Sequence, residues 1–193
     1  MNPEPHDTVT SYKDAPGRTV AAGGVTYAYR ELGPKGGVPV VFFMHLAANL
    51  DNWDPRVIDP IAQRHHVIAF DNRGLGASTG NVPDTVGAMA DDAYTFITAL
   101  GFETIDVFSF SLGGMVAQAL VVKHPGLVRK LILTGTGPAG GKDMDKGHHL
   151  RRHGPRRVEP QGSERVLVLQ PQPDRQASRQ GVRGTSQGTH RGS

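Results

Sequence analysis

Short runs of β-branched and aromatic residues alternate with helical stretches up to about Gly141, and this alternation constrains the fold more than any other feature. Residues 38–45 are almost continuously apolar, as expected of a strand buried on both faces. Similar runs occur at residues 66–71, 105–109 and 128–134. Strands that alternate with helices indicate a mostly parallel sheet covered on both faces. We therefore expect an α/β three-layer sandwich, entered through an antiparallel hairpin at about residues 18–31.

Two segments have the spacing of amphipathic helices. Residues 85–100 repeat apolar side chains on one face, with Asp84 as the predicted N-cap and Gly101 as the stop. Residues 112–124 do the same and end at Pro125 and Gly126. Each helix lies between two predicted strands, as a parallel sheet requires.

Charge divides the chain into unlike parts. Residues 1–146 carry 12 basic and 15 acidic side chains, whereas residues 147–193 carry nine Arg, no Lys and three acids. The positive charge therefore belongs to the tail rather than to a folded basic surface, and we do not expect a nucleic-acid partner. We predict a flexible N-terminus at residues 1–17, a domain at residues 18–146, and a disordered tail with at most a short strand at residues 166–169.

Composition excludes several classes of protein. The chain has no Cys, so it has no disulfide scaffold, no Cys-ligated zinc site and no Cys nucleophile. No stretch approaches the roughly 20 apolar residues of a membrane span, and residues 1–10 lack the apolar core of a signal peptide. We expect a cytoplasmic protein that acts on a small molecule without a metal or cofactor. The oligomeric state is left open.

The strongest chemical signal is Ser111, which lies between a predicted strand and a predicted helix. A nucleophile elbow needs such a strand, a sharp turn and a helix, with small residues two positions before and after the nucleophile. Ser109 and Gly113 fill these positions, although glycine is usual at the first. The backbone N–H of Leu112 would then face a developing oxyanion. The alternative is a chance turn of small residues, since short S-x-S-x-G strings are common.

Two further loops follow predicted strands. His45 is followed by Leu46 and Ala47, and the loop at this place normally supplies a second oxyanion donor, here the N–H of Ala47. We interpret His45 as an organiser that bonds loop carbonyls, not as a base. Asp71 and Arg73 precede two glycines, which indicates a turn held by a charge-assisted bond rather than a phosphate loop.

The three motifs H-L-A-A-N, D-N-R-G-L-G-A-S and S-F-S-L-G-G, in this order, resemble those of the α/β-hydrolase superfamily. Within it the chain is most similar to the esterase-like and cofactor-free haloperoxidase-like branch, over about residues 24–141. The resemblance implies the first part of that fold, with Ser111 as nucleophile and the amides of Leu112 and Ala47 as the oxyanion hole. It implies an ester-like or related acyl substrate and a peroxidase side activity.

The family places its catalytic acid and histidine later in the chain, beyond a helical cap, and here the sequence departs from the family. From residue 147 no apolar strand ends in an Asp, and the histidines stand among Gly and Arg. We therefore expect impaired activity, and an unpaired sheet edge at residues 128–134.

An Arg-, Gly- and Gln-rich tail without Lys is typical of a GC-rich gene read out of frame. A synonymous back-translation of residues 147–193, read one nucleotide later, can give V-T-T-F-A-V-M-A-R-A-V-L and later K-E-F-V-A-R-L-K-E, both with helical spacing. We favour a frameshift near Lys146 over an evolved tail. The competing hypothesis is a non-catalytic protein whose basic tail binds nucleic acid or another polyanion.

Overall fold

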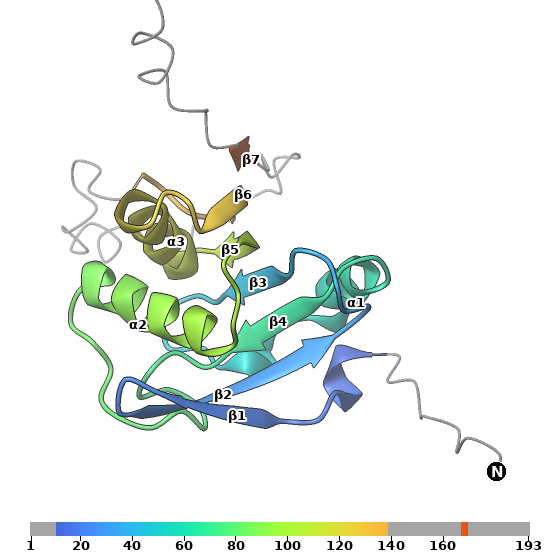
Figure 1. Ribbon diagram of the computed structural model, residues 1–193, viewed down its shortest axis with the longest axis horizontal. Helices are drawn as coiled ribbons and strands as arrows, with labels where there is room; N and C mark the ends of the chain where they lie inside the picture. The colour runs from blue at the N-terminus through green and yellow to red at the C-terminus, as the bar shows by residue number, and fades with distance from the viewer. Residues whose placement is uncertain (1–10, 139–166, 170–193) are drawn as a thin grey trace, which may run out of the picture.

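The computed structural model describes residues 11–138 and 167–169. In this part of the chain seven strands form one sheet in the order β1-β2-β4-β3-β5-β6-β7 (Figure 1). The strands are β1 (Arg18–Ala22), β2 (Val25–Leu32), β3 (Val40–Phe43), β4 (Val67–Phe70), β5 (Ile105–Phe110), β6 (Val128–Thr134) and β7 (Leu167–Leu169). β3 to β6 pair in parallel, and β1 and β2 form the expected antiparallel hairpin. The predicted α/β class is confirmed.

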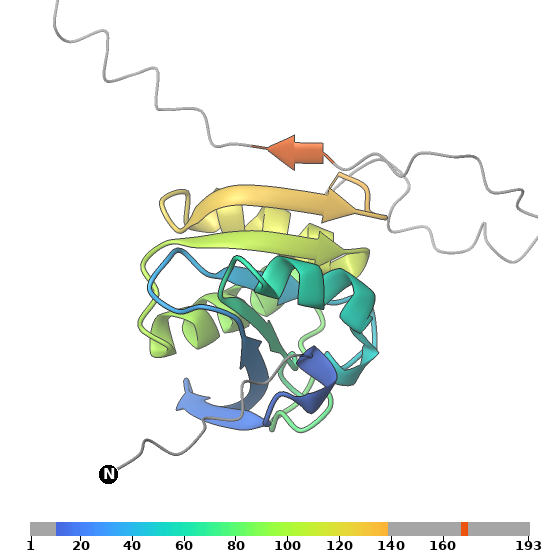
Figure 2. The same cartoon turned by 90° about the vertical axis from the view of Figure 1, so that its right-hand side faces the viewer.

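Helices cover both faces of this sheet, as the two views of the ribbon show (Figure 2). They are α1 (Pro55–Ala62), α2 (Val86–Ala99) and α3 (Leu112–Lys123), with the short 3₁₀ turns η1 (Tyr12–Asp14) and η2 (Leu50–Asn52). Alternate residues of β3 divide between two cores: Val41 and Phe43 pack on the side of α2 and α3, whereas Val40 and Phe42 pack on the side of α1. This alternation makes the three layers.

The helices differ from the predictions in two places. Thr85, not Asp84, is the N-cap of α2, since its hydroxyl accepts a hydrogen bond from Ala88 N at 3.1 Å. Both residues are good caps, and their order alone could not decide between them. Helix α1 was not predicted, because Pro60 inside its eight residues hides the helical signal.

The start of the described chain is packed, which differs from the flexible segment predicted for residues 1–17. Tyr12 is only 1% exposed, and its hydroxyl donates to Leu50 O at 2.8 Å. Asp59 accepts hydrogen bonds from Ser11 Oγ and Tyr12 N, both at 2.7 Å. One anchored aromatic ring therefore holds η1 against the domain, and the packed region begins before residue 18. Residues 1–10 lie outside the described residues.

The last strand of the sheet also differs from expectation. β7 pairs antiparallel with β6, with Leu131 opposite Leu169 and Leu133 opposite Leu167. The prediction of a short strand at residues 166–169 matches this position, whereas the prediction of an unpaired edge on β6 is wrong for these paired residues. Residues 167–169 belong to an apolar run of the tail, and such a run favours pairing as a strand with an edge strand such as β6. The rest of the predicted disordered tail lies outside the described residues.

Glu31, near the end of β2, gathers a cluster of basic partners. Its carboxylate lies 2.7 Å from Lys35 Nζ, 2.8 Å from His66 Nε2 and 3.1 Å from Arg18 Nε. Burial alone would raise the pKa of Glu31, but the hydrogen bonds from Lys35 and His66 outweigh it and lower that pKa below 4.5. The cluster therefore stabilises the fold only while Glu31 is ionised.

This cluster predicts how stability depends on acid pH. A carboxylate with a lowered pKa in the folded state contributes stability above its unfolded value, and this contribution is lost as the pH falls through the folded pKa. Below the unfolded value of 4.5, the free energy of unfolding of the unmodified chain should therefore fall more steeply than that of Glu31→Gln. Urea denaturation between pH 7 and about pH 3 measures it. The exposed Glu103→Gln is the matched control, and equal slopes for both variants would contradict the prediction.

Candidate active site

Three loops meet at one edge of the sheet because they follow the carboxyl ends of three neighbouring parallel strands. His45 comes after β3, Asp71 after β4 and Ser111 after β5. In open α/β sheets this edge is where ligands bind. The topology thus brings together all three motifs that the sequence singled out.

Ser111 occupies the sharp turn between β5 and α3. Its backbone has φ +54° and ψ −119°, and Ser111 and Ala47 are the two non-glycine residues with positive φ in the described part of the chain. Such a conformation is costly for a residue with a Cβ and is found mainly at functional sites. The Ser111 side chain forms no capping bond with α3, and the positive end of the α3 dipole lies beside it.

Small neighbours let this turn close. Ser109 is fully buried, and its hydroxyl donates to Ile132 O at 2.8 Å, so it is engaged away from the turn. Gly113 packs against the backbone of β3, where an added Cβ would collide with the Phe43 carbonyl and lie 2.7 Å from Met44 O. Ser109 and Gly113 lie two residues before and two after Ser111, and their role in a nucleophile elbow stays a prediction.

The loop after β3 holds Ala47 at φ +58°. His45 Nδ1 lies 3.0 Å from Leu46 O, and because a carbonyl only accepts, this nitrogen carries the hydrogen. The ring of His45 also packs edge-on against Phe110, with centroids 5.7 Å apart. These contacts fit the organising role expected of His45, and they place it beside the residue that precedes Ser111.

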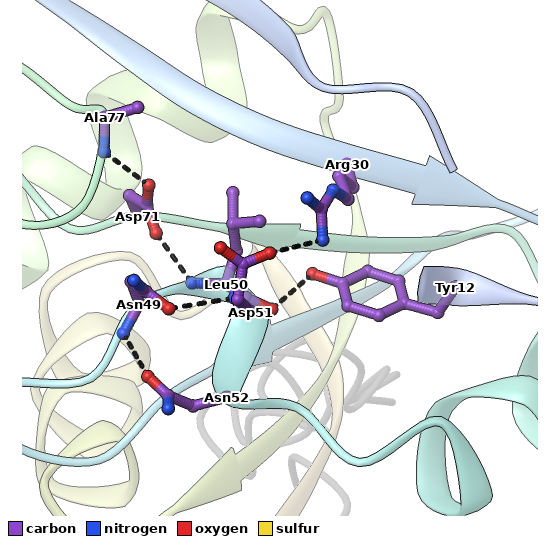
Figure 3. A network of polar contacts seen from close by, with 8 residues as sticks. All are labelled: Tyr12, Arg30, Asn49, Leu50, Asp51, Asn52, Asp71 and Ala77. Atoms are coloured by element: carbon purple, nitrogen blue, oxygen red, sulfur yellow. Dashed lines mark hydrogen bonds and ion pairs between the residues drawn. The ribbon is translucent and has the colours of Figure 1, made fainter. Parts of the chain in front are cut away.

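Asp71 joins the loops after β3 and β4. It is only 2% exposed, and its two carboxylate oxygens accept hydrogen bonds from Leu50 N at 2.7 Å and Ala77 N at 2.8 Å (Figure 3). Charge-assisted bonds to buried backbone N–H groups are among the stronger ones in proteins. Asp71 therefore fixes the loop that carries Ala47 relative to the turn at Ala77.

Arg73 does not take part in these hydrogen bonds of Asp71. We expected a charge-assisted bond between Asp71 and Arg73, but the ion pair of Arg73 is with Asp92 on α2, at 3.6 Å. Asp71 instead uses backbone donors, and Gly76 leaves room for its carboxylate, which a Cβ there would meet. The expected Asp71–Arg73 bond is therefore wrong, and the role of both residues in organising a site stays a prediction.

Two residues that sequence reasoning missed support the same loop. The buried Tyr12 hydroxyl donates to Leu50 O at 2.8 Å, and Arg30 Nη1 pairs with Asp51 Oδ1 at 2.6 Å (Figure 3). Burial raises the pKa of Tyr12, so its phenol stays protonated and remains a donor. Neither residue belongs to a motif, and no local signal in the sequence pairs it with the loop.

Two cavities border His45, one on each side. One of about 360 Å³ is lined by Ala47, Leu112 and aliphatic residues of the α2 start. The other, of about 280 Å³, is lined by Trp53, Phe108 and Phe110 among others. A wider depression of about 610 Å³ lies around Lys123 and His124, at the opposite end of the sheet. Among the described residues, His45 lines both smaller cavities and Ala47 and Leu112 line the first of them, whereas Ser111 lines neither.

Within residues 11–138 and 167–169, no three His, Cys, Asp or Glu side chains are grouped so that they could hold a metal ion. None of the helices in that same part combines the length and the apolar character needed to cross a membrane.

Comparisons with known proteins agree with this geometry. Over 83 residues the chain is 36% identical to a protein of Rhizobium rhizogenes named as a carbamate hydrolase, RutD, covering 42% of this chain and 31% of that one. Over 127 residues it is 31% identical to the non-heme chloroperoxidase of Streptomyces lividans, covering 63% and 45%. A solved α/β-hydrolase fold protein from Chitinophaga pinensis superposes with a TM-score of 0.65 at 41% identity, covering 66% and 46%.

The chain thus spans less than half the length of each of these relatives. A family model described as the alpha/beta hydrolase fold matches residues 38–157, which include the strands and loops that carry His45, Asp71 and Ser111. On that match and on the shared architecture, the chain belongs to the α/β-hydrolase family.

Proposed function

We propose that this chain derives from a serine hydrolase in which Ser111 attacks the carbonyl carbon of an ester-like or related acyl substrate. The observation that carries this proposal is the Ser111 backbone, at φ +54° between β5 and α3. A strained turn of this kind exposes a nucleophile above the sheet and places it at a helix N-terminus.

The oxyanion of the resulting tetrahedral intermediate would be bound by two backbone N–H groups. One belongs to Leu112, the first residue of α3, and the other to Ala47. Preorganised donors of this type stabilise the developing charge without reorganising during the reaction. Asp71, Tyr12 and His45 would keep the Ala47 loop in place through the hydrogen bonds described above.

The relatives support acyl chemistry. A carbamate, like an ester, carries a carbonyl carbon open to attack, and RutD is named for its hydrolysis. The chloroperoxidase relative supports a peroxidase side activity of the same site. We propose an ester-like substrate as the class that the Ser111 turn and the acyl chemistry of the carbamate hydrolase relative support.

None of the described histidines forms a hydrogen bond with Ser111 that would let it act as a general base. Of the four histidines in residues 11–138, His65 and His66 precede β4 and His124 follows α3, so all three lie at the far end of the sheet. His45 alone lies near Ser111, and among the described residues its ring makes no hydrogen bond with Ser111. We propose that hydrolase activity is impaired in this chain, and that residues from about 147 onward are read out of frame, with the acid and base encoded in the other frame.

Labelling with a fluorophosphonate probe tests the nucleophile. We expect weak labelling of the unmodified chain or none, and any labelling should disappear in Ser111→Ala, because Ser111 is the proposed nucleophile. Ser109→Ala should label like the unmodified chain, since the Ser109 hydroxyl is buried and bonded to Ile132 O. Mass spectrometry of the labelled peptide distinguishes the two serines.

Labelling that persists in Ser111→Ala and disappears in Ser109→Ala would reverse the assignment. The competing function, a polyanion-binding protein, rests on the nine Arg of residues 147–193. No labelling, together with salt-sensitive binding of DNA that is lost on removing residues 147–193, would favour it.

A further inference from the structure

The end of β6 is hydrogen-bonded to the Ser111 turn. β6 lies beside β5 in the sheet, with Thr134 opposite Phe110 (Figure 1). Ser111 N donates a hydrogen bond to Thr134 O at 3.0 Å, and Thr134 Oγ1 donates to Ser109 O at 2.8 Å. Thr134 therefore bonds the backbone on both sides of Phe110, through its own carbonyl and through its hydroxyl.

The residues directly after Thr134 continue this contact. Gly135 has φ +54°, and an added Cβ there would lie 2.6 Å from Phe110 Cε2, so only glycine leaves room for that ring. Gln118 of α3 donates from Nε2 to Gly137 O at 2.9 Å. Residues 134–137, which we name the β6 exit, thus contact both the strand before Ser111 and the helix after it.

Ser111 needs such support because its backbone is strained. A residue with a Cβ persists at φ +54° only where the surrounding structure over-determines its conformation. Among the described residues outside β5 and α3, Thr134 is the one whose side chain hydrogen-bonds to residues 109–114. Valine favours a strand as threonine does, so the propensity of β6 does not require the hydroxyl.

We infer that Thr134 is a positioning residue for the proposed nucleophile. Its carbonyl and its hydroxyl hold the backbone of residues 109–111, and so keep Ser111 in the left-handed conformation of the turn. This inference rests on the proposed function, because the position of Ser111 affects reactivity only if Ser111 is the nucleophile. Thr134 acts through the backbone and needs no contact with a substrate.

Thr134→Val tests the inference, since it removes the hydroxyl and keeps the β-branched shape. In the full chain, the amide of Ser111 should exchange with deuterated solvent roughly 3- to 10-fold faster, as the loss of one hydrogen bond predicts. Native-state hydrogen exchange followed by NMR measures this rate. Thr134→Ser restores a hydroxyl and should restore the slower exchange.

Thr98→Val is the matched control. Thr98 also donates its hydroxyl to main-chain carbonyls, those of Tyr94 and Thr95, but it lines the depression at the opposite end of the sheet. It should leave exchange at Ser111 unchanged, because the loss of its bonds affects only general stability. Unchanged exchange in Thr134→Val, no recovery in Thr134→Ser, or equal acceleration in Thr98→Val would each overturn the inference.

Fluorophosphonate labelling supplies a readout that a purely structural role would not move. In Thr134→Val the maximal labelling rate at Ser111 should fall roughly 3- to 10-fold, whereas the probe concentration for half-maximal rate should stay the same. Thr134→Ser should recover the rate. Labelling of Ser111 at the same rate in Thr134→Val would support the nucleophile and overturn the inference.

Hydrogen exchange separates the inference from the proposed function, since it needs no reaction. Faster exchange at Ser111 in Thr134→Val, with no labelling of any chain, would refute the nucleophile and leave the contact with Thr134 standing.

Discussion

Replacing Gly113 with alanine should destabilise the fold by about 3 kcal/mol or more, at the upper end of what overpacking costs. The Cβ would collide with the Phe43 carbonyl and lie 2.5 Å from its carbon and 2.7 Å from Met44 O. These are backbone atoms of β3 and of the residue after it, so no side chain can rotate away. Helix α3 would have to move off the sheet, and the Ser111 turn would move with it.

The measurement is the free energy of unfolding in urea, with Gly126→Ala as the matched control. Gly126 has ordinary φ, and a Cβ there meets nothing within 4 Å. We expect Gly126→Ala to change stability by less than about 0.5 kcal/mol, as open surface positions do. A Gly113→Ala chain as stable as the Gly126→Ala chain would show that the start of α3 is not seated on β3.

The Ser111 turn could be predicted from sequence because its determinants are adjacent in the chain. Ser109, Ser111 and Gly113 lie within five consecutive residues, between an apolar run and a helical one. A strand, a sharp turn and a helix follow from local sterics, and the structure has Ser111 between β5 and α3, with Ser109 in β5 and Gly113 in α3. The parallel order of the strands then brings His45 and Asp71 to the same edge.

The support of the Ala47 loop could not be predicted, because its contacts join distant or featureless parts of the chain. Tyr12 and Leu50 are 38 residues apart. The partners of Asp71 are the N–H groups of Leu50 and Ala77, which any residue but proline would supply. The sequence shows where a carboxylate lies, but it does not show which backbone N–H groups will contact it. Arg73 was therefore the expected partner of Asp71, although Asp71 accepts hydrogen bonds from backbone donors instead.

Restoring the reading frame should raise hydrolysis of p-nitrophenyl acetate by at least about 10⁴-fold over the 193-residue chain, because removal of catalytic-triad residues lowers kcat by roughly 10⁴- to 10⁶-fold. The change is the deletion of one nucleotide near codon 146, so that translation continues in the frame whose back-translation has helical spacing. The increase is expected because the restored residues would supply the general base that Ser111 needs. Ser111 is positioned by its turn, but His45 is the one described histidine at its end of the sheet, and no hydrogen bond among the described residues joins its ring to Ser111.

Both chains are assayed with and without Ser111→Ala, so that hydrolysis through Ser111 is separated from background. Sequencing the gene from codon 140 past the stop comes first, since it shows whether the second frame stays open. In the restored chain Ser111→Ala should abolish the gain, because the added residues act only through that hydroxyl.

The stability of the sheet edge, measured by unfolding in urea, tests this prediction in a second and independent way. In the described part of the chain, β6 pairs antiparallel with three residues of β7, over Leu131 to Leu133. A parallel sheet that continues past β6 would instead pair along the strand and bury its apolar face. The restored chain should therefore also unfold at higher urea concentration. If the 193-residue chain hydrolyses the ester through Ser111 as fast as the restored one, the frameshift proposal fails, and the base must be one of the histidines already present.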